Sequence, residues 1–140
     1  MDGCKITKLS VSGEVVAPTP AKSRLIEVVG DSISAGYGIL TSDNDAADDV
    51  NTDATYSYVK ILADKMGAQV NLIANSGRGI YANSDGSTKD AMPTLYDKLL
   101  PGVEDTAFDH SSVNPDIIIV NLGTNDSFAM KEHSEITEEN

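Results

Sequence analysis

Three short apolar runs divide the chain, and each is followed by glycine and small polar residues. They occupy residues 25–29, 69–74 and 116–122, and β-branched side chains are frequent in all three. Continuous apolar runs of about four to eight residues are typical of strands that are buried on both faces of a parallel sheet. We therefore expect three parallel strands at these positions.

Two segments between these runs have their apolar residues at helical spacing. The first, residues 58–66, has Thr52 or Asp53 as a candidate cap before it and Gly67 as a cap after it. The second, residues 93–100, ends at a Pro-Gly pair. The resulting order of strand, helix, strand, helix and strand predicts an α/β fold with right-handed crossovers between parallel strands.

The first 20 residues differ in character from the rest. Residues 5–16 alternate weakly between apolar and polar around a turn at residues 12–14, which favours a short hairpin. Pro18 and Pro20 then indicate a linker. We therefore interpret residues 1–20 as a linker or the remnant of a preceding domain, and residues 21–140 as the main domain.

The net charge and the cysteine content limit which partners and which disulfide bonds the chain can have. The chain has 22 acidic and 10 basic residues, and a net charge of -12 argues against nucleic acid and anionic membranes as partners. The single cysteine, Cys4, excludes an internal disulfide bond. No apolar run approaches the about 20 residues of a membrane-spanning helix. Residues 1–5 lack the apolar core of a signal peptide, so an export signal would lie outside this chain.

Sequences that could form a site follow all three predicted strands. They are Gly-Asp-Ser at 30–32, Asn-Ser-Gly at 75–77 and Gly-Thr-Asn-Asp at 123–126. In open α/β sheets, functional groups gather at the carboxyl ends of the parallel strands. We therefore expect these three loops to meet at one edge of the sheet.

Ser32, Gly77 and Asn125 combine a candidate nucleophile with donors for an oxyanion. A serine between a strand and a helix start can attack a carbonyl, while backbone N–H groups and an Asn amide stabilise the negative charge. Each residue also has a structural interpretation, because Ser is a common helix cap and Asn a common turn residue. Asp31 and Asp126 are interpreted as acceptors that brace these loops rather than as catalytic acids.

The sequence around these residues resembles the SGNH (GDSL-type) hydrolase superfamily. Residues 30–34, Gly-Asp-Ser-Ile-Ser, resemble its nucleophile block, and residues 75–79, Asn-Ser-Gly-Arg-Gly, resemble its second block. Residues 123–126 match its Gly-x-Asn-Asp block. All three blocks occur in family order, each after a predicted strand, and the resemblance covers roughly residues 21–130.

Within this superfamily the chain looks like carbohydrate esterase family 2, whose members remove acetyl groups from xylan and glucomannan. The similarity lies in residues 26–38, 56–58, 76–80 and 121–126. It implies a flavodoxin-like three-layer α/β/α fold, incomplete here because three of about five strands are readable. It also implies a secreted, extracellular protein that needs no metal or organic cofactor, with residues 1–20 as the linker from, or the remnant of, a preceding small β-sandwich domain.

The resemblance assigns roles to individual residues. Ser32 would be the nucleophile, and Gly77 and Asn125 would complete the oxyanion hole. Gly79 is the alternative for the glycine, because the second block is the least fixed in its spacing. The reaction implied is Ser-dependent hydrolysis of a carboxylic ester, with an acetylated polysaccharide or a small acyl ester as the substrate. The oligomeric state is left open.

The catalytic histidine of the family is not found in the sequence. The family carries it in an Asp-x-x-His block near the end of the domain, and no such block occurs in this chain. His110 and His133 are interpreted as exposed loop residues. We therefore expect residues 21–140 to be the N-terminal part of a hydrolase domain, weakly active or inactive by itself. The alternatives are a catalytically inactive module that binds carbohydrate or a partner, and a general GDSL lipase or acyl esterase.

Two other classes of site can be weighed from the sequence. Residues 77–82 fit the loose dinucleotide pattern Gly-x-Gly-x-x-Ala, but that pattern needs a helix to begin at once, and residues 83–87 interrupt one. Five aspartates lie within residues 41–53, yet they lack the Gly and the closing Glu of an EF-hand calcium loop. We favour a surface loop without a metal for this segment.

Overall fold

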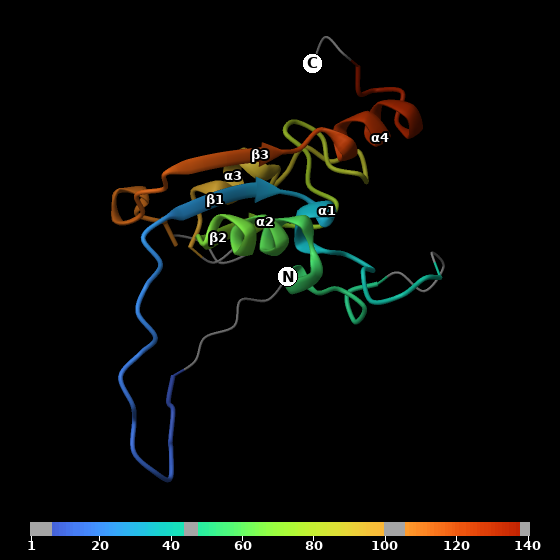
Figure 1. Cartoon of the computed structure of the whole chain (residues 1–140). Coiled ribbons are helices and arrows are strands. Elements are labelled where there is room, and N and C mark those ends of the chain that lie inside the picture. The colour runs from blue at the N-terminus through green and yellow to red at the C-terminus, as the bar shows by residue number, and fades with distance from the viewer. Residues whose placement is uncertain (1–6, 44–47, 100–105, 138–140) are drawn as a thin grey trace.

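β1 (Leu25–Gly30) is the middle strand of a parallel sheet with the order β2-β1-β3 (Figure 1). β2 (Gln69–Ala74) and β3 (Ile117–Asn121) pair with it on either side. This computed structural model describes residues 7–43, 48–99 and 106–137. The strands agree with the three apolar runs to within one residue at each end, so the predicted parallel α/β sheet is confirmed.

Helices cover both faces of the sheet (Figure 1). α2 (Tyr58–Met66) belongs to the core cluster that contains Ile26 and Val28 of β1, and α3 (Met92–Tyr96) packs against Val29. Successive side chains of a strand point to opposite faces, so the two helices lie on opposite sides of β1. Burial of each such aliphatic side chain contributes about 1.5–3 kcal/mol to stability. The result is the expected three-layer arrangement.

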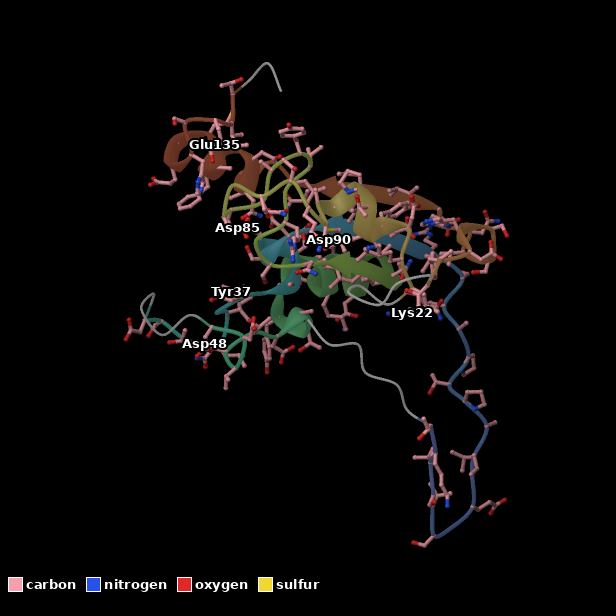
Figure 2. The ribbon with its side chains drawn as sticks, turned by 180° about the vertical axis from the view of Figure 1, so that it is seen from behind. Lys22, Tyr37, Asp48, Asp85, Asp90 and Glu135 are labelled. Atoms are coloured by element: carbon pink, nitrogen blue, oxygen red, sulfur yellow. The ribbon has the colours of Figure 1, made fainter. Side chains whose placement is uncertain are left out.

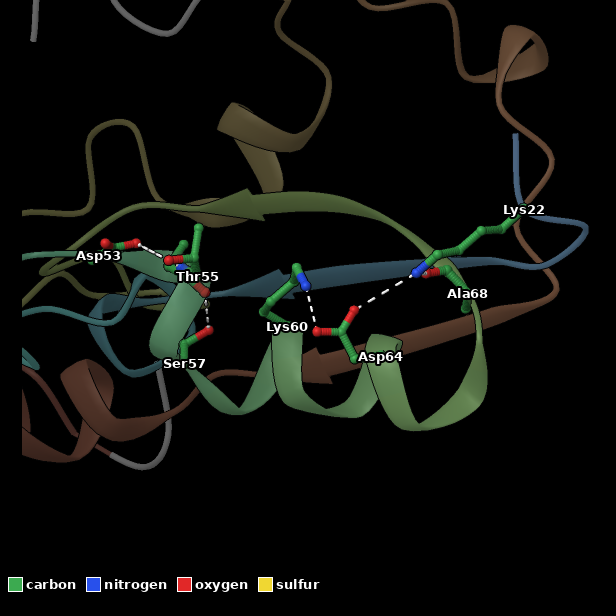
Figure 3. Close-up of polar contacts among 8 residues, drawn as sticks. Lys22, Asp53, Thr55, Ser57, Lys60, Asp64 and Ala68 are labelled. Carbon is green, nitrogen blue, oxygen red and sulfur yellow. Dashed lines mark hydrogen bonds and ion pairs between the residues drawn. The ribbon is translucent and has the colours of Figure 1, made fainter. Parts of the chain in front are cut away.

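The two ends of α2 are capped differently from each other. Gly67 follows the helix with a left-handed φ of 59°, as predicted. Ser57 is the N-cap residue and makes no capping hydrogen bond with its side chain, so the assignment of Thr52 or Asp53 to this role was wrong. Asp53 instead caps the 3-10 helix η2 (Ala54–Tyr56), which intervenes before α2 (Figure 3).

The second predicted helix is shorter than expected, and a further helix was not predicted. α3 ends at Tyr96 rather than at residue 100, because the chain then forms an antiparallel bridge between Lys98 and Ala107. α4 (Thr124–Glu132) begins directly after the third strand, where only a loop was expected. The Gly-Thr-Asn-Asp block therefore lies at the N-terminal end of a helix.

Residues 7–24 form no strand and no helix, which corrects the hairpin expected around residues 12–14. A hairpin of two strands is only marginally stable without a third strand or a helix to pack against. The apolar side chains of this segment have no such cover and are largely exposed: Leu9, Val11, Val15 and Val16. Figure 1 shows the segment extending away from the sheet.

The extended segment is attached to the domain at Lys22 (Figure 3). The Lys22 ammonium donates a hydrogen bond of 3.0 Å to the carbonyl oxygen of Ala68 and lies 3.6 Å from the carboxylate of Asp64. Asp64 also pairs with Lys60 one turn earlier in α2. Exposed ion pairs contribute little to stability, so the bond to the backbone carbonyl is the more specific contact.

β3 forms an exposed edge of the sheet. Ile118 is 56% exposed and Val120 is 64% exposed, and β1 is the only strand paired with β3 within the described part of the chain. Three strands are fewer than the about five that the resemblance implies, so the sheet is incomplete. Among the described residues, no helix combines the length and the apolar character needed to cross a membrane.

Candidate active site

Ser32 begins the short helix α1 (Ser32–Ala35) directly after β1. Asp31 is the N-cap of this helix, because its carboxylate oxygen Oδ1 accepts a hydrogen bond of 2.9 Å from the backbone N–H of Ile33. Ser32 is therefore not the capping residue, which removes the simplest structural explanation for a serine here. Its side chain is half-buried, and its Oγ has no hydrogen-bond partner within the described residues.

The second loop holds two glycines with different environments. Gly77 has a φ of 78°, a left-handed conformation that favours glycine, and its N–H has no acceptor among the residues that the structure describes. The N–H of Gly79 donates to Oδ1 of Asn83 at 3.3 Å. A Cβ at Gly79 would lie 1.9 Å from the carbonyl oxygen of Ala82, so a larger residue cannot fit there.

Asn125 brings the three loops together. It is 8% exposed, and its Nδ2 donates a hydrogen bond of 2.9 Å to the carbonyl oxygen of Arg78 in the second loop. The same nitrogen donates a longer bond of 3.4 Å to Oδ2 of Asp31 in the first loop. The structure thus places Ser32, Gly77 and Asn125 on three segments that follow the strands and contact one another at the carboxyl end of the sheet: the start of α1, the second loop and the start of α4.

Asp126 connects the second loop to the start of α4. Its carboxylate accepts three backbone hydrogen bonds, from Ile80 at 2.8 Å, Tyr81 at 2.7 Å and Ala82 at 3.0 Å. Burial by itself would raise the pKa of Asp126, but these three N–H groups outweigh burial and hold the pKa below its ordinary value. Asp31 and Asp126 are both acceptors that brace the loops, as predicted.

Both histidines are half-buried rather than exposed, and only His133 lies outside a helix, which corrects the expectation of two exposed loop residues. His110 starts the 3-10 helix η3 (His110–Ser112) before β3, and its half-buried ring stacks on Tyr96 with centroids 4.2 Å apart. His133 follows α4, and its half-buried ring lies against Gly86. Neither ring has a hydrogen bond to Ser32 among the described residues. Both rings remain about a third exposed, and each has an acidic neighbour: His110 lies 3.0 Å from Asp97 and His133 lies 3.8 Å from Glu135.

The structure also tests the two alternative sites. No helix begins between residues 77 and 91, so the dinucleotide interpretation of the second loop is wrong. Of the aspartates in residues 41–53, one falls in residues 44–47, outside the described part. The described residues contain no group of three or more His, Cys, Asp or Glu side chains placed to hold a metal ion. Figure 2 shows Tyr37 and Asp48 on the segment after α1, well separated from Glu135 beyond α4.

A known protein family matches the part of the chain that carries this geometry. A family model described as GDSL-like Lipase/Acylhydrolase matches residues 26–140. The chain belongs to the GDSL-like lipase/acylhydrolase family. The match begins within β1 and includes the rest of the sheet and all three loops.

Two curated relatives of this GDSL-like chain are carbohydrate-active esterases. It is 36% identical to the cellulase/esterase CelE of Acetivibrio thermocellus over 124 residues, which cover 86% of the chain and 15% of that relative. It is 35% identical to an acetylxylan esterase / glucomannan deacetylase of Cellvibrio japonicus over 127 residues, 86% of the chain and 35% of the relative. The chain therefore spans about a third or less of the length of these relatives.

Solved structures that are similar to this chain are also carbohydrate esterases. A family two carbohydrate esterase from Clostridium thermocellum, in complex with cellohexaose, matches with a TM-score of 0.75 and 32% identity, over 81% of the chain and 35% of that protein. A family two carbohydrate esterase from Cellvibrio japonicus matches with a TM-score of 0.73 and 32% identity, over 81% of the chain and 34% of that protein. The resemblance of this GDSL-like hydrolase to carbohydrate esterase family 2 is confirmed.

Two polar residues of this core were missed in the sequence. Glu27 lies within an apolar run, yet it is 2% exposed and accepts hydrogen bonds from Tyr96 Oη at 2.7 Å and Asn71 Nδ2 at 2.8 Å. Asn83 is also 2% exposed and donates to the carbonyl oxygen of Lys89 at 2.8 Å. A charged residue inside a β-branched run was the one available signal for Glu27.

Proposed function

We propose that Ser32 is the nucleophile of a carboxylic ester hydrolase and that Gly77 and Asn125 supply its oxyanion hole. The observation that supports this proposal is the Asn125 amide, which contacts both the loop of Ser32 and the loop of Gly77. An amide at this junction can donate to an oxygen that develops charge when Ser32 attacks a carbonyl. The bond to Asp31 is the longer of its two, and it is the one that an oxyanion would replace.

Gly77 is preferred over Gly79 as the backbone donor. The N–H of Gly79 is already donated to Asn83, whereas the N–H of Gly77 has no acceptor within the described residues. A donor without a protein acceptor can bind an oxyanion without first losing a hydrogen bond. The Ser32 N–H, at the start of α1, is the third proposed donor.

The reaction would proceed through an acyl-enzyme. Ser32 Oγ forms a bond to the carbonyl carbon as a base removes its proton, and the alcohol of the ester leaves with that proton. Water then attacks the acyl group, and the acid and free Ser32 are released. Neither His110 nor His133 contacts Ser32 in the described residues, so we propose that these 140 residues alone turn over slowly or not at all.

The substrate is proposed from the relatives. Two of them are named acetylxylan esterase / glucomannan deacetylase, so we propose an acetylated plant cell-wall polysaccharide as the substrate of the whole protein. A small acyl ester would be a simpler substrate of the same site. A protein that acts on such polysaccharides would be secreted.

The test labels the nucleophile rather than measuring turnover. The chain is incubated with a fluorophosphonate, with imidazole added as an external base, and the adduct is located by mass spectrometry of its peptides. An adduct on Ser32 that is lost in Ser32→Ala is expected. Ser34→Ala is the matched control, because Ser34 is buried and its Oγ is hydrogen-bonded to Tyr58 Oη at 2.8 Å. Labelling elsewhere, or none, would contradict Ser32 as the nucleophile.

A second candidate function is carbohydrate binding without catalysis. The positions of the two histidines favour it, since a serine without a base is a weak nucleophile. In one carbohydrate esterase that is 31% identical to this chain, the active site displays divergent catalytic and non-catalytic binding functions. Titration calorimetry with cellohexaose distinguishes the two candidates. Binding that survives in Ser32→Ala, together with no adduct on Ser32, would favour the binding module.

A further inference from the structure

The second loop lies along one face of α4. Asp126, Ala129 and His133 are three and four residues apart, so they share a face of this helix and its C-terminal end. Asp126 accepts hydrogen bonds from the loop, Ala129 packs in one cluster with Ala82, and the ring of His133 lies next to Gly86. The loop and the helix therefore form one packed unit (Figure 1).

We propose that Asp126 is a positioning residue that fixes the Gly77 N–H relative to the Asn125 amide, an inference that rests on the proposed oxyanion site. Asp126 directly follows Asn125 on α4, and its three hydrogen-bond donors lie only three to five residues after Gly77. The loop that carries Gly77 and the helical turn that carries Asn125 are thus joined through one side chain, although they come from separate parts of the chain. Asp126 does not contact Ser32 in the described residues, so its effect passes through its neighbours.

The loop is shaped for a carboxylate at this position. Three successive N–H groups converge on the two oxygens of Asp126, an arrangement of backbone donors that favours an anion. Gly79 approaches the same carboxylate closely, because a Cβ at this glycine would lie 2.7 Å from Asp126 Oδ2. An amide at position 126 would offer only one acceptor oxygen, and its NH₂ group would face a backbone donor.

Packing and hydrogen bonding can be separated at this contact. Ala82, Ala129 and Ile136 form a buried apolar cluster beside Asp126, with exposures of 0%, 0% and 8%. This cluster does not depend on the carboxylate, so it keeps the loop attached when Asp126 is replaced by Asn. The expected result is a folded protein whose loop is attached but less precisely placed.

Nuclear magnetic resonance of the 140-residue chain tests the proposal without requiring catalysis. In Asp126→Asn, we expect amide exchange at residues 80–82 to accelerate about tenfold or more, and the signals of the Gly77 N–H and the Asn125 side-chain amide to shift. Asp85→Asn is the matched control, because Asp85 lies on the same loop and its carboxylate accepts hydrogen bonds from the backbone N–H and the hydroxyl of Ser87 rather than from residues 80–82. The control should leave the Gly77 and Asn125 signals unchanged.

The outcomes separate this inference from the proposed function. Faster exchange at residues 80–82 without any shift at Gly77 or Asn125 would show a merely structural contact and overturn the proposal. If Asp126→Asn does not fold, Asp126→Glu is measured instead. Its longer side chain keeps the charge but moves the carboxylate, so this variant must also shift the Gly77 and Asn125 signals. In fluorophosphonate labelling, Asp126→Asn should slow adduct formation at Ser32 by up to about 10². Absence of any Ser32 adduct would refute the esterase proposal and leave the resonance result as the test of positioning.

Discussion

The Nδ2 atom of Asn125 lies 2.9 Å from the carbonyl oxygen of Arg78, although 47 residues separate the two in the chain. The same nitrogen reaches Asp31, which adjoins Ser32. Because one buried amide contacts both other loops, its two N–H donors contribute to the geometry of the strand-end cluster together with the contacts of Asp126. Changes at Asn125 should therefore affect stability as well as chemistry.

Asn125→Asp should destabilise the fold at neutral pH. The new carboxylate would face the buried Asp31 carboxylate and the Arg78 carbonyl, and it has no proton to donate to either. Each buried acceptor left without a donor costs about 1–3 kcal/mol in unfolding free energy. The loss, measured by urea denaturation, should shrink in acid, where a protonated carboxyl can donate again.

Asn121→Asp is the control for that substitution. Asn121 Nδ2 donates to Tyr58 Oη at 3.3 Å, and a hydroxyl can reverse its role and donate to a carboxylate. We expect the control to be clearly less destabilising. Equal losses of unfolding free energy in the two variants would show that the Asn125 amide contributes no more to stability than the Asn121 amide.

Stability in acid should report on Asp126. Its pKa is lowered in the folded protein, so it contributes stability above the pKa of an unfolded aspartate, about 3.9, and loses that stability as pH falls through its folded-state pKa. The difference in melting temperature between the wild type and Asp126→Ala should therefore be largest near neutral pH and diminish below about pH 4. A difference that does not change between pH 7 and pH 3 would contradict the role of the charge.

Gly79 and Gly67 should respond to alanine for different reasons. A Cβ at Gly79 would collide with the Ala82 carbonyl and approach Asp126, so Gly79→Ala must displace backbone and cost about 1–3 kcal/mol. Gly67 has open space around a Cβ, and Gly67→Ala is penalised only for its φ of 59°, by about 1–2 kcal/mol. Amide exchange distinguishes the two, because only Gly79→Ala should expose residues 80–82.

Tyr96→Phe should leave a buried carboxylate oxygen without its donor. The hydrogen bond to Glu27 raises the pKa of Tyr96, and removal of the hydroxyl leaves Glu27 Oε1 unsatisfied while Asn71 still binds Oε2. The expected loss in unfolding free energy is about 1–3 kcal/mol. Tyr56→Phe is the comparison, since Tyr56 is 63% exposed and its loss should be within about 0.5 kcal/mol.

The sequence predicted the sheet better than the connections between its strands. The three apolar runs gave the strands almost to the residue, but the burial on both faces that they predicted holds only for β1, since β3 is an exposed edge. The start of α2 was misplaced, since the 3-10 helix η2 intervenes and its cap at Asp53 resembles the cap of a longer helix. α4 was missed because its first turn, Thr124 to Asp126, has the composition of a loop.

The place of the candidate site could likewise be predicted from the sequence, whereas the contacts within it could not. Ser32, Gly77 and Asn125 could be placed at one edge because parallel strands end together, and the loops that carry them do contact one another. The choice between Gly77 and Gly79 could not be made from spacing, since it depends on which N–H Asn83 accepts. The stacking of His110 on Tyr96 depends on packing between residues distant in sequence, and no local pattern indicated it.

The attachment at Lys22 determines which way a fused partner would face. Lys22 bonds to Ala68, just before β2, and this is the amino end of the strands rather than the end that carries Ser32. The segment before Lys22 therefore joins the domain at the end of the sheet opposite the three loops. Immobilised through that segment, the protein would present its serine loop outward to a bulky polymer.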